Sequence, residues 1–492
     1  MSDKMKVLLV SAEAYPFAKV GGLADVAGSL PEPLHEKNLD IRVIIPLYDK
    51  IDREKFGIKF SGVEFEVAMG QNQEPGRLWC GTFPGSDIPA YFIESKKYFG
   101  RPGIYTDPET GEAYVDDGER FVFFNKAVIE AVHGLGWTPD VFHCNDYQTG
   151  LIPALVKLRY PGNKIGFLYS IHNLAYQGRF DKSILDLIGV GHDRFYPMGD
   201  FEFFGQVNFM KIGIQFADII NTVSPTYAVE IQSSEEYGYG LEGVLRAARD
   251  RLHGILNGID TAVWNPALDK NIAANFDLKD KSGKAKCKLD LLREVGLPEK
   301  PDTPLIGVIT RLADQKGFDI LLPIMEDILA EDVLFVLLGT GKKEYEAQLT
   351  ALAKAHPDKM AAIIDFKGPL AHKIEAGSDM FLMPSRYEPC GLNQMYSMAY
   401  GTVPVVRKTG GLADTITPAD FAKNTGTGFV FDKYESKALL AVVKQAIKAY
   451  SDKPGWQKLM DRDMQFDSSW GASADKYIEL YRHALSLRRW SQ

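Results

Sequence analysis

The sequence predicts an α/β fold with parallel sheets, arranged as two similar halves. Short β-branched runs alternate with longer amphipathic stretches along the 492 residues, and this alternation is typical of parallel sheets with helices on both faces. The pattern Lys-x-Gly-Gly-Leu-Ala-Asp occurs twice, at residues 19–25 and 408–414, each time after an apolar run. A chain this long exceeds one typical core, so more than one domain is expected. The repeat favours two halves that face one ligand.

The apolar runs give two sets of candidate strands. The first set lies at 7–10, 42–45, 90–93, 141–144, 165–171 and 219–223, and the second at 255–256, 305–310, 334–338, 362–366, 380–383 and 403–406. Several runs are apolar at nearly every residue, as strands buried on both faces require. Amphipathic periodicity predicts helices at 318–329, 344–355, 437–450 and 473–487. An Asn-Gly turn signal at 257–258 marks the best boundary between the halves.

Composition excludes several classes of function. The net charge of −9 argues against general nucleic-acid binding, which needs clustered Lys and Arg. The four cysteines lie far apart without zinc-ligand spacing, so a cytoplasmic chain with free thiols is expected. The apolar run near the N-terminus is too short for a signal peptide, and no run of about eighteen apolar residues predicts a membrane span.

Chemically suggestive residues follow the predicted strands. In open parallel sheets, ligands bind beyond the carboxyl ends of the strands. Residues in such positions are Lys19, His143, Asp146, His172, Arg311, Lys316, Gly339 and Glu388. Six strand ends therefore carry glycine, histidine or charge, and we expect a binding site to form there.

Two of these strand ends suit a phosphorylated ligand. Arg311 offers a bidentate fork and Lys316 a mobile point charge, which together suit a diphosphate; the alternative is a pair of surface charges at a helix start. Glu388 lies directly before a predicted helix whose N–H groups can hold a phosphate or sugar hydroxyls. The alternative for Glu388 is that it only complements the helix N-terminus.

Other motifs are weak or absent. A lone histidine such as His143 or His172 is more often structural than catalytic. Residues 238–243 match G-x-G-x-x-G, but no strand leads into them, so we interpret them as a loop before a helix. The Walker A, HExxH and G-x-S-x-G patterns do not occur.

Taken together, the motifs resemble the bacterial glycogen synthase and plant starch synthase family of GT-B glycosyltransferases. The resemblance spans nearly the whole chain and rests on the order and spacing of its motifs. They are Lys19-Val-Gly-Gly-Leu-Ala-Asp25-Val, His143-Cys-Asn-Asp146-Tyr-Gln, Ile171-His-Asn, Leu256-Asn-Gly-Ile-Asp, Thr310-Arg-Leu-Ala-Asp-Gln-Lys-Gly, Pro384-Ser-Arg-Tyr-Glu-Pro-Cys-Gly-Leu and Lys408-Thr-Gly-Gly-Leu-Ala-Asp-Thr.

The resemblance implies two Rossmann-like, doubly wound domains that face a deep interdomain cleft. Residues 1–252 would form the N-terminal glucan-acceptor domain, and residues 253–466 the C-terminal nucleotide-sugar domain. Residues 467–492 would form a helix that crosses back to the N-terminal domain.

The resemblance also implies a role for each motif. The catalytic residues would be Glu388, Arg311, Lys316 and His172, with the two cations on the donor diphosphate and Glu388 on the transferred glucose. The donor and the sugar site would be lined by Lys19, Gly21, Gly22, Asp25, Asp146, Asn257, Phe366, Gly391, Leu392 and Asn393. Among these, the ring of Phe366 would stack on the donor base, and the backbone at 391–393 would bind the distal phosphate.

The implied reaction moves glucose from ADP-glucose to the non-reducing-end 4-hydroxyl of an α-1,4-glucan (glycogen or starch), with retention of configuration. No cofactor or metal is implied, and neither nucleic acid nor membrane is an expected partner. Three departures from the family pattern are Val20 for Thr, Phe99 for Tyr and Tyr147 for Trp.

Three alternatives remain open. UDP-glucose as the donor would keep the fold and the mechanism. A non-catalytic glucan-binding protein would leave the set Lys19, Arg311, Lys316 and Glu388 without a purpose. A nicotinamide dehydrogenase would need a dinucleotide fingerprint that the sequence lacks.

Overall fold

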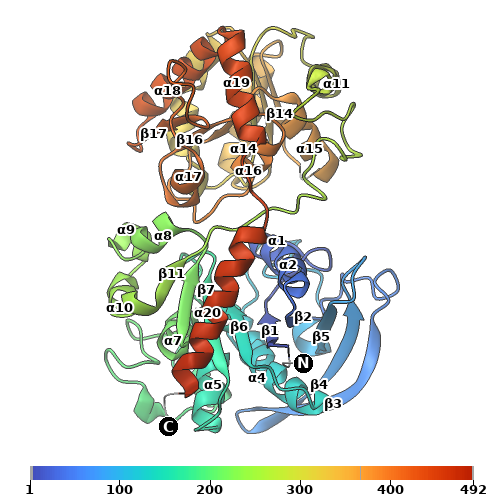
Figure 1. Cartoon of the computed structure of the whole chain (residues 1–492). Coiled ribbons are helices and arrows are strands. Elements are labelled where there is room, and N and C mark those ends of the chain that lie inside the picture. Colours follow the sequence, from blue (N-terminus) through green and yellow to red (C-terminus); the bar gives the residue numbers. More distant parts are fainter. Residues whose placement is uncertain (1–3, 366, 490–492) are drawn as a thin grey trace. The chain divides into compact units, whose positions relative to one another are not determined.

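The computed structural model describes residues 4–365 and 367–489. Its contacts divide the chain into two compact units (Figure 1). The first comprises Met1–Val223, Ala228–Gly258 and Trp470–Gln492, and the second comprises Ser224–Tyr227 and Ile259–Ser469. Among the described residues, no helix is both long and apolar enough to cross a membrane.

The first unit is built on one nine-stranded sheet in the order β11-β10-β7-β6-β1-β2-β5-β4-β3. Seven neighbouring strands are parallel: β1 (Lys6–Val10), β2 (Asp40–Pro46), β5 (Pro89–Glu94), β6 (Val141–Asn145), β7 (Gly166–Ile171), β10 (Ile219–Thr222) and β11 (Leu252–Gly254). The strand order reverses between β1 and β6, and this switch point is where an open α/β sheet binds its ligands.

An antiparallel hairpin, β3 (Lys59–Met69) and β4 (Asn72–Thr82), extends the edge beyond β5. The sequence did not predict it, because β3 alternates exposed and half-buried residues instead of forming an apolar run. The predicted strand at 255–256 is wrong, since the strand ends at Gly254. Beyond it, the Ile255 N–H still donates to the Thr222 carbonyl at 2.9 Å. The short pair β8 (Arg179–Phe180) and β9 (Val207–Asn208) forms a separate ribbon.

Helices surround the first sheet. They are α1 (Gly22–Ser29), α2 (Pro31–Glu36), α3 (Lys96–Phe99), α4 (Asp117–Leu135), α5 (Ile152–Arg159), α6 (Ile184–Ile188), α7 (Phe209–Phe216), α9 (Glu235–Gly238), α10 (Glu242–Ala247) and α20 (Gly471–Arg489), with α8 (Pro225–Glu230) at the boundary between the units. The helix predicted at 473–487 is confirmed as part of α20, which lies along β6 and β7 (Figure 1). Tyr481 on this helix hydrogen-bonds the ring of His143 at 2.9 Å, so His143 has a structural partner.

The second unit is a six-stranded, fully parallel sheet in the order β14-β13-β12-β15-β16-β17. Its strands are β12 (Leu305–Ile309), β13 (Leu334–Leu338), β14 (Met360–Ile363), β15 (Met380–Met383), β16 (Val403–Arg407) and β17 (Phe429–Phe431). In chain order this arrangement is 3-2-1-4-5-6, the doubly wound Rossmann order, with its switch point between β12 and β15. The prediction of two Rossmann-like α/β domains is therefore confirmed.

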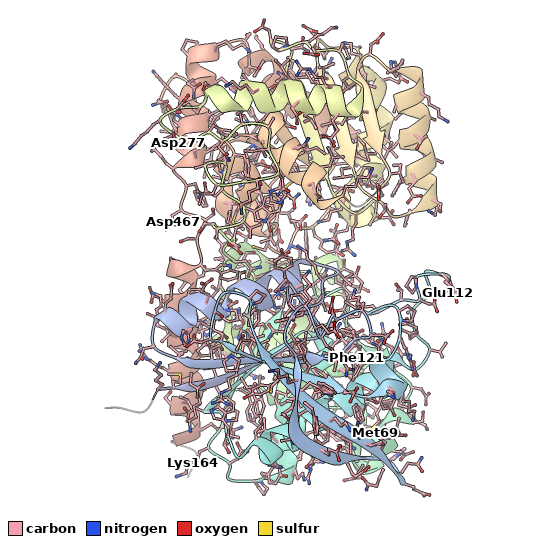
Figure 2. All side chains as sticks on the ribbon, turned by 90° about the vertical axis from the view of Figure 1, so that its right-hand side faces the viewer. Met69, Glu112, Phe121, Lys164, Asp277 and Asp467 are labelled. Carbon is pink, nitrogen blue, oxygen red and sulfur yellow. The ribbon has the colours of Figure 1, made fainter. Side chains whose placement is uncertain are left out.

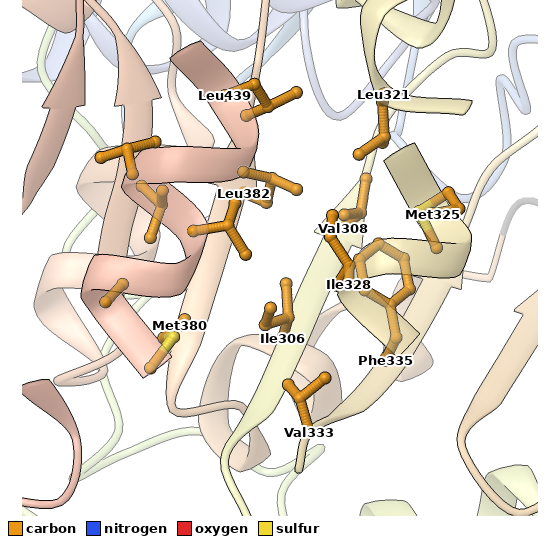
Figure 3. Close-up of a cluster of buried hydrophobic side chains, with 14 of the residues drawn as sticks. Ile306, Val308, Leu321, Met325, Ile328, Val333, Phe335, Met380, Leu382 and Leu439 are labelled. Atoms are coloured by element: carbon orange, nitrogen blue, oxygen red, sulfur yellow. The ribbon is translucent and has the colours of Figure 1, made fainter. Parts of the chain in front are cut away.

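The core of the second unit lies between this sheet and its helices. Ile306 and Phe335 of the sheet belong to one hydrophobic cluster with Ile328 and Leu439 of the helices, and all four are fully or almost fully buried (Figure 3). The helices are α11 (Ser282–Val295), α12 (Phe318–Leu321), α13 (Met325–Leu329), α14 (Lys343–Ala355), α15 (Gly368–Gly377), α16 (Asn393–Ala399), α17 (Gly410–Thr415), α18 (Ser436–Ala449) and α19 (Lys453–Met464).

Two predicted elements of this unit need correction. The helix expected at 318–329 is interrupted by a 3-10 turn at Leu322–Ile324, because Pro323 has no N–H to continue the helical ladder. The strand expected at 362–366 lies earlier, at Met360–Ile363.

Candidate functional site

The two loops at the switch point of the second sheet are joined to each other. The loop after β12 passes so close to the loop after β15 that a Cβ on Gly317 would lie 2.0 Å from the Pro384 carbonyl. Gln315 accepts the Arg386 N–H at its carbonyl (2.8 Å) and donates its side-chain amide to the Tyr387 carbonyl (3.3 Å). The segments that carry Lys316 and Glu388 therefore form one rigid edge.

A partly buried ion pair lies at this edge. Lys316 Nζ contacts Glu388 Oε2 at 2.7 Å, and their side chains are 18% and 8% exposed. The Ser385 hydroxyl donates to the same carboxylate oxygen at 2.9 Å. Because a cation and an acid lie in contact beside the switch point, the site can hold an anionic group and a polar group next to each other.

The guanidinium of Arg311 is exposed, and no hydrogen bond or ion pair found in residues 4–365 and 367–489 involves it. Arg311 follows β12 by two residues, so it shares the edge with Lys316. A second cation is thus available to a ligand without first breaking an ion pair.

The segment predicted to bind a distal phosphate follows Glu388 directly. Gly391 has φ +73, a left-handed conformation that favours glycine. Leu392 and Asn393 lead into α16, and the Asn393 side chain donates to the Ile309 carbonyl at 3.2 Å. The structure therefore places residues 391–393 at the carboxyl end of β12, in the same unit as Arg311 and Lys316.

The second Gly-Gly loop (residues 408–411) packs on this edge. Cβ atoms built on Gly410 and Gly411 would lie 1.9 Å from the Glu388 carbonyl oxygen and 2.1 Å from the Cys390 carbonyl oxygen. The Gly411 N–H also donates to the Glu388 carbonyl at 3.1 Å. These glycines are required so that the loop can lie against residues 388–390.

The first Gly-Gly loop (residues 19–22) is different. A Cβ on Gly21 would meet no heavy atom within 4 Å, and its φ of −141 is open to any residue. The fold itself does not need glycine here, which favours the interpretation that a ligand approaches this backbone. Lys19 Nζ pairs with Asp25 at 2.6 Å, so both predicted residues of this motif meet.

Sequence reasoning missed Glu13, which lies under the first Gly-Gly loop. Its carboxylate accepts the N–H groups of Val20 and Gly21 and the hydroxyl of Tyr105. The side chain is almost fully buried at 3% exposure. The available signal was an acid three residues after the end of the first strand, a position where a charge needs a partner.

Asp146 and His172 meet at the carboxyl ends of β6 and β7. The His172 N–H donates to Asp146 Oδ1 at 2.8 Å. Burial raises the pKa of Asp146 to about 7, although main-chain N–H groups of residues 172 and 173 oppose this rise. Asp146 also has φ +55, an uncommon conformation for a residue with a side chain. A strained acid with a displaced pKa is typical of a functional position.

The tautomer of His172 follows from its partner, Asn145. The Asn145 side-chain amide donates to the carbonyls of Val10 and His143 at 3.0 and 3.1 Å. Its Oδ1 therefore faces His172 Nε2, 2.8 Å away, and that nitrogen carries the proton. Burial lowers the pKa of His172 to about 3. The ring is therefore neutral near pH 7, and its other nitrogen is an acceptor.

Two further predicted residues have less definite surroundings. Asn257 is buried, and its Oδ1 has no hydrogen-bond partner in the described part of the chain. Phe366 lies outside the described residues. The G-x-G-x-x-G segment at 238–243 leads into the helix α10, as its interpretation as a loop before a helix predicted, and another helix, α9, precedes it. Within the described ranges, no group of three or more His, Cys, Asp or Glu residues is placed to hold a metal.

Comparison with known proteins finds similar proteins along nearly the whole chain. Residues 6–247 match the model of the starch synthase catalytic domain, and residues 294–457 match the model of glycosyl transferases group 1. The chain is 47% identical to the glycogen synthase of Thermosipho africanus over 494 residues, covering 99% of this chain and 100% of that protein. It is 44% identical to the glycogen synthase of Thermotoga maritima over 491 residues, covering 98% and 99%.

A solved structure is similar along nearly the same length. The catalytic domain of starch synthase IV from Arabidopsis thaliana, bound to ADP and acarbose, has a TM-score of 0.90 and 33% identity. The alignment covers 98% of this chain and 100% of that one.

Proposed function

The chain belongs to the family of bacterial glycogen synthases and plant starch synthases, with the GT-B fold, and from this premise we propose that it elongates an α-1,4-glucan. It is a glucosyltransferase that takes glucose from ADP-glucose and adds it to the 4-hydroxyl at the non-reducing end, with retention of configuration. ADP in the related starch synthase structure supports an adenine nucleotide as the donor, and acarbose there supports a glucan as the acceptor.

One observation in the structure carries this assignment. Lys316 and Glu388 form a partly buried ion pair at the switch point of a Rossmann-ordered sheet, beside the exposed guanidinium of Arg311. A glucan-binding protein needs no such pair of cations. A diphosphate does, because its charge increases as the glycosidic bond to the sugar breaks.

The proposal gives each group a task. Arg311 and Lys316 bind the donor diphosphate, and the incoming anion competes with Glu388 for Lys316. Glu388, held by Ser385 at 2.9 Å, then contacts the glucose. Lys19 and the backbone at Gly21 and Gly22 contribute further contacts to the donor.

The first unit supplies the remaining sugar contacts. Neutral His172 offers an acceptor nitrogen to a sugar hydroxyl, and Asp146 and Asn257 complete that set. Because front-face attack lets the leaving phosphate take the acceptor's proton, the reaction needs no strong protein base and no metal. We also propose that the protein is located in the cytoplasm.

The test is release of nucleoside diphosphate from ADP-glucose and from UDP-glucose, each with and without glycogen. Glycogen-dependent release of ADP is expected. Preference for UDP-glucose would keep the mechanism and change the donor. No release from either sugar nucleotide, with glycogen still bound in a sedimentation assay, would replace the proposal with a binding protein.

A further inference from the structure

Glu13 holds the first Gly-Gly loop from its inner side. Its Oε2 accepts the N–H of Val20 and, at 3.1 Å, the N–H of Gly21. Glu13 is 3% exposed, whereas Val20 is 47% exposed. The loop therefore has a buried carboxylate beneath it and a bare outer surface, and the main-chain groups next to Lys19 are fixed by one side chain.

The second oxygen of the same carboxylate reaches a different segment. Glu13 Oε1 accepts the hydroxyl of Tyr105 at 2.9 Å. Tyr105 belongs to a small hairpin at residues 101–116, which the ion pair of Arg101 with Asp116 closes at its base. The hairpin projects from the first unit, with Glu112 near its tip (Figure 2). The side chain of Glu13 thus joins two loops that are about ninety residues apart in the sequence.

The energetic cost of burying the Glu13 carboxylate indicates that this side chain does more than fill space in the core. A buried acid is costly unless it is hydrogen-bonded, and burial raises the pKa of Glu13 in spite of its three donors. The neighbouring acid Asp25 adds to this rise. Val20 is exposed and Gly21 is half-buried, whereas the carboxylate that accepts their N–H groups is buried. The arrangement therefore orders the loop at a cost to the fold.

We propose that Glu13 is a positioning residue for glucosyl transfer: it holds the loop that presents Lys19 to the donor and links this loop to the hairpin at 101–116. The inference rests on the proposed function, in which Lys19 contacts the donor. Glu13 itself touches no substrate in this proposal and acts through the backbone of residues 19–21.

Two substitutions separate positioning from packing. Glu13→Met has a side chain of similar length and fills the site without an acceptor, whereas Glu13→Gln keeps one acceptor oxygen. Hydrogen–deuterium exchange of the peptide that contains residues 17–23 should become about tenfold faster in the Met variant and remain slow in the Gln variant, because only a bonded N–H is protected. Equal exchange in wild type and Glu13→Met would overturn the proposal.

Kinetics give the second readout. Glu13→Met should raise the KM for ADP-glucose about tenfold and leave the KM for glycogen within about twofold, with recovery in Glu13→Gln. In a Lys19→Ala background, the same substitution should change the donor KM by less than about threefold, since residues that act as a unit are not additive. If Glu13→Met raised the KM for ADP-glucose by the same factor with Lys19 and with alanine at position 19, Glu13 would not act through Lys19.

The link to the hairpin has its own control. Tyr105→Phe removes only the hydroxyl, so exchange in 101–116 should become faster while exchange in 17–23 stays slow. Unchanged exchange in the hairpin would remove the link from the proposal. If the wild-type protein released no nucleotide from any donor, the proposed function would fail, and the exchange measurements would still decide whether Glu13 orders the loop.

Discussion

Replacing Gly410 by alanine should destabilise the second unit, whereas the same change at Gly21 should not. The two glycines occupy matching positions of the repeated pattern Lys-x-Gly-Gly-Leu-Ala-Asp. Their surroundings differ completely. Gly410 has φ +44, and a Cβ there would lie 1.9 Å from the Glu388 carbonyl oxygen, whereas a Cβ on Gly21 would meet nothing within 4 Å.

The magnitude follows from these two environments. A left-handed conformation costs an L-residue about 1–2 kcal/mol, and forcing an atom into packed surroundings costs about 1–3 kcal/mol more. Gly410→Ala should therefore lower the free energy of unfolding of the second unit by about 2–5 kcal/mol. Gly21 is extended, at φ −141, so alanine there should leave stability unchanged or raise it by about 0.4–1 kcal/mol through the unfolded chain.

Differential scanning calorimetry of both variants tests this reasoning. For a unit of this size, the expected loss in Gly410→Ala corresponds to a fall in Tm of about 10 °C. Gly21→Ala serves as the matched control, and it should keep its Tm while losing activity if a donor approaches that backbone. A Tm for Gly410→Ala within about 1 °C of wild type, or equal losses in both variants, would refute the argument.

Three further outcomes are expected. Lys316→Met should lower the rate of ADP release about 10²–10³-fold, as loss of a preorganised charge does, while circular dichroism shows an intact fold; a loss under threefold would contradict the diphosphate role. The raised pKa of Asp146, about 7, means that the folded state holds a proton that the unfolded chain releases near pH 4. The contribution of Asp146 to stability should therefore fall as pH rises from about 4 to 7. In urea titrations, the free energy of unfolding of wild type minus that of Asp146→Asn should decrease over this range, and a difference that does not change with pH would contradict the raised pKa. Cys80 is partly exposed and Cys390 buried, so a thiol reagent should modify Cys80 first in the native protein, and mass spectrometry showing faster modification of Cys390 would contradict its burial.

The sequence by itself determined the fold class, and it predicted at which edge of the sheet the candidate site lies. Alternation of apolar and amphipathic runs depends only on local periodicity, so it predicted most of the parallel strands. Residues that follow those strands, such as Arg311, Lys316 and Glu388, could be assigned to the binding edge because parallel strands end at one side of a sheet. The family motifs then supplied the chemistry of the donor and the acceptor.

Only the tertiary structure decided which residues contact each other. Lys316 and Glu388 are 72 residues apart, and their ion pair exists because β12 and β15 are neighbours in the sheet. The two heptapeptides, which differ only at Val20 and Thr409, have their first glycines in unlike surroundings. A Cβ on Gly410 would meet another backbone, whereas a Cβ on Gly21 would meet nothing within 4 Å. Glu13 gave little local signal, because its partners lie in a folded loop and a distant hairpin. Periodicity is a property of neighbours in sequence, whereas a hydrogen bond between loops depends on where the whole sheet places them.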